Sequence, residues 1–77
     1  MSKRYELAKR AAQDTLCLTA LDNGREHHRL FPDQMLAAVG REASLVYPDN
    51  KEAALAYVQG YSQARRQHEE FMAESER

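Results

Sequence analysis

The C-terminal third of the chain carries a stripe of mainly apolar residues at alternating steps of three and four. These residues are Ala54, Tyr57, Tyr61, Ala64, His68, Phe71 and Ser75. Such steps keep side chains on one face of an α-helix, and a helix with this spacing can pair with another along that face. The pattern predicts a long helix over about residues 50–74. Because the segment before it is too short to cover it fully, we expect the end of this helix to project.

A shorter amphipathic pattern precedes the long helix. Its apolar face consists of Leu36, Val39, Ala43 and Val46. This spacing predicts a helix over about residues 33–46. Pro32 and Pro48 each stand just before a predicted helix, where proline is tolerated and biases the preceding residue away from helical conformation. Asp49 and Glu52, three residues apart, form a capping pair that supports a helix start near residue 50.

The N-terminal segment is compatible with either a helix or a β-hairpin. A stripe of Leu7, Ala11, Leu18 and Leu21, interrupted by Asp14, predicts a helix over about residues 3–22. Asn23-Gly24 would then end that helix, with a residue in left-handed conformation closing the last turn. The same dipeptide is also a strong hairpin-turn signal, so a β-hairpin within residues 15–31 is an alternative. We favour the helix because the segment after Gly24 lacks the alternation of a strand.

The composition favours helices and a thin core. Of 77 residues, twelve are alanine, eight are leucine and three are valine, and isoleucine and tryptophan are absent. Because β-branched and aromatic residues prefer sheets, this bias predicts an all-α fold, a small three-helix bundle in one domain over residues 1–77. A chain of this length buries only about 60% of its unfolded surface. We therefore expect help from outside the chain, most simply from a second copy.

The charge is nearly balanced, with 11 basic and 12 acidic residues and a net charge of −1. A nucleic-acid or anionic-membrane footprint usually shows a marked basic excess, which is missing here apart from a locally basic N-terminal segment. Cys17, the single cysteine, excludes an internal disulfide and fits a reducing compartment. No apolar run approaches the ~20 residues of a membrane span, and the N-terminus lacks a signal-peptide pattern. We expect a cytoplasmic protein without a membrane partner.

The sequence contains no motif typical of catalysis, metal binding or cofactor binding. His27 and His28 are adjacent, and together with Cys17 and His68 they do not form a zinc-ligand spacing. There is no glycine-rich phosphate loop and no pattern that nominates a nucleophile and its base. We therefore expect no enzyme activity, no metal, no cofactor and no small-molecule substrate.

Side chains of the types enriched at protein interfaces gather on the long C-terminal helix. The predicted partner-binding residues are Tyr57, Tyr61, Arg65, His68, Phe71 and Met72. They predict a small protein–protein interaction module, an adaptor or inhibitor-like regulatory accessory protein of bacterial or phage type. We expect a homodimer through this helix, although Phe71 and Met72 could instead fold back onto the first helix.

Two further hypotheses concern the same helix. In a parallel dimer, two His68 side chains would face each other, and their protonation would weaken the dimer at low pH. As an alternative function, the second and third helices resemble a helix-turn-helix in order, which would make the chain a nucleic-acid-binding regulator. The early exposed positions Asn50, Lys51, Glu52 and Leu55 are poorly suited to reading bases, so we rank this function second.

Overall fold

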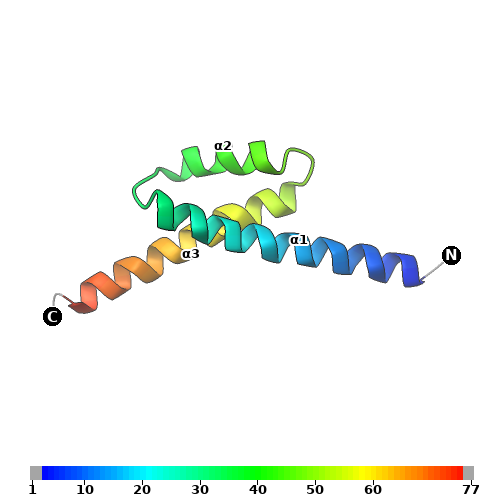
Figure 1. The fold of residues 1–77 in the computed structure, drawn as a ribbon, viewed down its shortest axis with the longest axis horizontal. Helices are drawn as coiled ribbons and strands as arrows, with labels where there is room; N and C mark the ends of the chain where they lie inside the picture. The colour runs from blue at the N-terminus through cyan, green and yellow to red at the C-terminus, as the bar shows by residue number, and fades with distance from the viewer. Residues whose placement is uncertain (1–2, 76–77) are drawn as a thin grey trace.

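The computed structural model describes residues 3–75, which form three α-helices and no strand. Helix α1 spans Lys3–Leu30, α2 spans Leu36–Val46 and α3 spans Lys51–Ser75. The last third of α1 crosses the first half of α3, and α2 packs on α3 at one side of the crossing (Figure 1). The predicted all-α three-helix bundle is confirmed, and the hairpin alternative is wrong. None of these helices is both long enough and apolar enough to cross a membrane.

The crossing of α1 and α3 depends on two glycines. A Cβ atom placed on Gly24 would lie 1.9 Å from the backbone oxygen of Tyr57, and one on Gly60 would lie 2.0 Å from the backbone oxygen of Leu21. No side chain can be accommodated at such distances, so only glycine at both positions lets the two backbones approach this closely. Ala20 of α1 and Ala56 of α3 are also buried. Small residues on both helices thus permit the close approach at the crossing.

The prediction that Asn23-Gly24 ends the first helix is wrong. Helix α1 continues to Leu30, and no glycine of the described residues has a positive φ. The signal was misleading because Gly24 serves the approach of two helices and not a left-handed turn. Packing against α3 stabilises the helical conformation of Gly24 and outweighs the roughly 1 kcal/mol by which glycine is poorer than alanine in a helix.

Helix α2 begins at Leu36, three residues later than predicted. The backbone N–H of Gln34 donates to the Tyr61 hydroxyl (3.0 Å), and the N-cap residue Met35 is extended, with φ −69° and ψ 144°. The Tyr61 hydroxyl in turn donates to the backbone oxygen of Phe31 (2.7 Å). A buried phenol needs such partners. Tyr61 therefore holds the connection between α1 and α2 in an extended form.

Helix α3 has almost the predicted bounds, but a different residue caps it. The side-chain oxygen of Asn50 accepts a hydrogen bond from the Ala53 N–H (3.1 Å), so Asn50 is the N-cap in place of the predicted Asp49. Glu52 accepts a hydrogen bond from Gln13 of α1 instead of returning to the cap. The start of α3 is thus tied to α1 as well as capped locally.

The hydrophobic core is small and consists mainly of alanine. Its buried members are Ala20, Val39, Ala43, Ala53, Ala56, Tyr57 and Tyr61. Of these, only Tyr61 and Val39 are large side chains that are fully buried. A core of this kind contributes little more than the cost of ordering the chain.

The molecule is elongated, with extents of 58 × 25 × 14 Å and a radius of gyration of 15.2 Å. A compact domain of this length would have a radius of roughly 11 Å. The difference arises because the first part of α1 and the last part of α3 extend beyond the crossing in opposite directions (Figure 1). We call residues 4–12 the N-terminal arm and residues 67–74 the C-terminal arm. All described side chains of both arms are exposed.

Candidate protein-interaction surface

The predicted partner-binding residues fall into two groups in the structure. Tyr57 and Tyr61 are 6% and 0% exposed, so they lie in the core of the chain and not on its surface. The remaining residues of the group are exposed, and they are Arg65, His68, Phe71 and Met72. The crossing with α1 separates the two groups. Only the second group is accessible to a partner in this structure.

The apolar stripe that predicted α1 faces outward. Leu7, Ala11 and Leu18 are exposed, and Leu21 is half-buried. The inner face of α1 is formed by Leu16 and by residues that are smaller or more polar than leucine, namely Gln13, Cys17, Ala20, Gly24 and His27. The spacing of this second face is present in the sequence, but its low hydrophobicity does not mark it as a buried face. A small side chain allows a close helix contact without being strongly apolar.

Large apolar side chains are abundant on the surface. Among the described residues, eleven of them are between 46% and 76% exposed. They are Leu7, Leu18, Leu30, Phe31, Met35, Leu36, Leu45, Val46, Leu55, Phe71 and Met72. Single exposed apolar residues are normal, but this set exceeds the large apolar side chains of the core. The surface therefore holds more of the chain's apolar material than its interior does.

A cluster of rings joins α1 to α3 next to the crossing. The ring of His28 lies edge-on to Tyr61, with centroids 5.2 Å apart, and to His68, with centroids 5.8 Å apart. Burial lowers the pKa of His28, and the charges of His68 and Arg65 lower it further. His68 thus contacts a histidine of its own chain. No three metal-ligating side chains come together among the described residues.

His27 is held on both ring nitrogens. Its Nε2 contacts Gln34 Oε1, which can only accept, so Nε2 carries the proton. Its Nδ1 then accepts from the hydroxyl of Tyr57. Burial raises the pKa of Tyr57, with a further contribution from Glu42, so the phenol remains a donor. The paired histidines of the sequence therefore serve packing and hydrogen bonding at the crossing.

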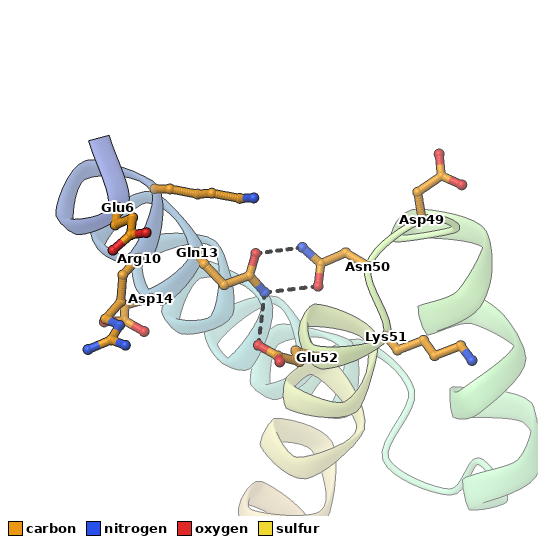
Figure 2. Close-up of a pocket in the computed structure, with 9 residues that line it drawn as sticks. Glu6, Arg10, Gln13, Asp14, Asp49, Asn50, Lys51 and Glu52 are labelled. Atoms are coloured by element: carbon orange, nitrogen blue, oxygen red, sulfur yellow. Dashed lines mark hydrogen bonds between the residues drawn. The ribbon is translucent and has the colours of Figure 1, made fainter. Parts of the chain in front are cut away.

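A polar cleft of about 820 Å³ lies between the N-terminal half of α1 and the start of α3. Gln13 and Asn50 exchange two hydrogen bonds across it, at 3.0 and 2.9 Å, and Gln13 also donates to Glu52 (3.2 Å). Figure 2 shows these three side chains pointing toward one another, whereas Asp49 and Lys51 point away from Gln13. The polar groups at the centre of the cleft form hydrogen bonds with each other, and these bonds connect α1 to the start of α3.

The described chain thus presents its apolar surface, and not the cleft, as its most distinctive feature. No family model, no curated protein and no solved structure shows a significant match to this chain.

Proposed function

We propose that this protein is a small, non-enzymatic protein–protein interaction module that acts by helix packing and self-associates. The observation that carries the proposal is the imbalance between surface and core. Among the residues that the structure describes, eleven large apolar side chains are exposed and two large side chains are fully buried. Burial of apolar surface is the main favourable term in association, at about 25 cal/mol per Å². A partner that covers these side chains would add the burial of apolar surface that the small core does not provide.

The shape of the molecule supports the same proposal. Two helices extend past their crossing in opposite directions (Figure 1), and all described side chains of the two arms are exposed. Helices of such length gain most of their stability from packing on an apolar face. The module would serve as an adaptor or as an inhibitor-like accessory protein in the cytoplasm. The single half-buried thiol of Cys17 is compatible with a reducing compartment.

A nucleic-acid-binding function has less support. In a helix-turn-helix, the N-terminal residues of the recognition helix contact base edges. The corresponding exposed residues of α3 include Lys51, Glu52 and Leu55, a set without net positive charge. Strong non-specific binding to duplex DNA that falls steeply with salt would favour this alternative over the interaction module.

The test is the solution mass of the chain, measured by light scattering behind a sizing column over a range of concentrations. We expect a dimer that dissociates on dilution. Phe71→Asp places a charge on the exposed part of α3 and should shift the equilibrium toward a folded monomer. Gln59→Asp is a matched control, because Gln59 is an exposed α3 residue outside the arms. A wild-type chain that stays monomeric at every soluble concentration would contradict self-association.

A further inference from the structure

The two arms carry opposite charges. In the N-terminal arm, Arg4, Lys9 and Arg10 oppose Glu6, which gives a net charge of +2. The C-terminal arm contains three glutamates and no lysine or arginine, which gives −3; these glutamates are Glu69, Glu70 and Glu74. The chain as a whole is nearly neutral, so this separation of charge is a property of the arms.

Each arm also has the unfavourable sign for its own helix dipole. The N-terminal end of a helix carries a partial positive charge and disfavours basic residues, and the C-terminal end disfavours acidic ones. The basic arm begins α1, and the acidic arm ends α3. If the two arms lay side by side, both mismatches would be offset at once. They cannot do so within one chain, because they lie at opposite ends of the 58 Å long axis (Figure 1).

Apolar side chains lie among these charges. Leu7 is 62% exposed and stands three residues from both Arg4 and Arg10, so the three share one side of the helix. Met72 is 47% exposed and stands three residues from Glu69. An apolar contact flanked by opposite charges is the usual composition of a paired-helix seam.

We propose that a second copy of this chain covers both arms, in a dimer with two-fold symmetry. The N-terminal arm of each copy lies against the C-terminal arm of the other. A two-fold axis perpendicular to the long axis exchanges the two ends of the molecule, so it brings unlike arms together at both ends. This inference rests on the proposed self-association and specifies its surface. A second copy is the fitting occupant because the two complementary surfaces belong to the same chain.

Reversing the charges of one arm tests the pairing. Lys9→Glu/Arg10→Glu makes both arms of a copy acidic, and Glu70→Lys/Glu74→Lys makes both arms basic. Each variant alone should dimerise roughly tenfold or more weakly than the wild type, because like charges meet at both symmetric contacts. An equimolar mixture of the two variants should form a heterodimer, in which both contacts join unlike arms. The fourfold variant should again form a homodimer.

Two controls keep the result interpretable. Arg41→Glu/Lys51→Glu makes the same change in net charge as Lys9→Glu/Arg10→Glu, but on exposed residues outside the arms, and it should leave the dimer unchanged. Circular dichroism of each variant establishes that it is still helical. Sodium chloride at high concentration should weaken the wild-type dimer and strengthen self-association of the single-arm variants, because it screens both effects.

The outcomes separate the inference from the function on which it rests. A wild-type monomer would remove both proposals. A wild-type dimer that is insensitive to both charge reversals, or variants that fail to form a heterodimer on mixing, would overturn the pairing of the arms. Self-association would then belong to another face, and the outward stripe of α1 would be the next surface to vary. Selective heterodimer formation would support the pairing, because no single-surface contact elsewhere predicts it.

Discussion

The two halves of α3 share one spacing of apolar positions but lie in different environments. In the first half, Tyr57 and Tyr61 are buried against α1 and the connection to α2. In the second half, Phe71 continues the same stripe and Met72 follows it, and both are exposed. The difference arises because the two straight helices diverge beyond their crossing (Figure 1). Helical spacing therefore identifies a face that can be covered, while the path of the neighbouring helix decides how much of it is covered.

The largest expected effect comes from filling the crossing. In Gly24→Ala, the new methyl group would overlap the backbone of Tyr57, and rotation of a side chain cannot relieve the overlap. We expect a loss of about 3 kcal/mol or more in the free energy of unfolding. In so small a domain this loss will leave much of the chain unfolded. Urea denaturation followed by circular dichroism measures it.

Gly40 provides the matched control for that substitution. It is also a helical glycine, but a Cβ atom there would meet nothing within 4 Å. Gly40→Ala should therefore stabilise the chain by about 0.5–1 kcal/mol, because alanine is the better helix former. Equal effects of the two substitutions would contradict the close approach of α1 and α3.

A smaller effect is expected from removing the buried hydroxyl of α3. Tyr61→Phe deletes the donor to Phe31 and leaves the Gln34 N–H without its acceptor, at a cost of about 1–3 kcal/mol. In Tyr47→Phe, the hydroxyl lost accepts from Asn23 at an exposed position, and the cost should be a few tenths of a kcal/mol. Chemical denaturation of both variants compares them directly. If Tyr61→Phe is as stable as the wild type, the hydroxyl does not anchor the connection between α1 and α2.

The smallest expected effect is a loss of stability at low pH caused by His28 of α1. Burial, and then repulsion from His68 and Arg65, lowers the pKa of His28, while Asp33 and Glu69 oppose this shift. The unfolded chain takes up a proton at His28 near pH 6.5. Stability is therefore full above about pH 6.5 and falls as the pH drops below it, because the unfolded state then binds more protons.

The comparison is made with His28→Gln, which cannot titrate. Urea midpoints at pH 7.5 and pH 5.5 should differ less for this variant than for the wild type. His68→Gln should reduce the dependence only in part, since burial of His28 is the first cause of its lowered pKa. A wild-type midpoint that does not change between the two pH values would exclude a role for His28 in acid sensitivity.

Several features were predictable because they follow from local sequence. The bounds of α3 and the break at Tyr47–Asn50 result from apolar spacing and from a proline beside capping residues, which act within a few positions of the chain. The shorter helix α2 was predicted for the same reason, with an error of three residues at its start. That error came from Tyr61, which binds Gln34 across the fold. Contacts of this kind have no signature in the neighbouring sequence.

The candidate surface was predicted only in part. Helical spacing placed Arg65, His68, Phe71 and Met72 together with Tyr57 and Tyr61, although α1 covers only the latter two. The apolar stripe that predicts α1 includes Leu7 and Leu18, the type of large apolar residue that usually faces the core, but both are exposed. In this chain the two glycines and the alanines of the crossing select the opposite face, because backbones that approach closely exclude large side chains.

The helical class, the approximate bounds of α2 and α3, and the charges of the two ends therefore follow from the amino-acid sequence. These properties depend on interactions among residues that are close along the chain. Helix packing determines three other features: the continuation of α1 through Asn23-Gly24, the face of α1 that is buried, and the point at which α1 ceases to cover α3. Each of these depends on one helix–helix contact, in which Gly24 approaches Tyr57 and Gly60 approaches Leu21. The partners in that contact are far apart in sequence, and its strength comes from shape and not from hydrophobic pattern.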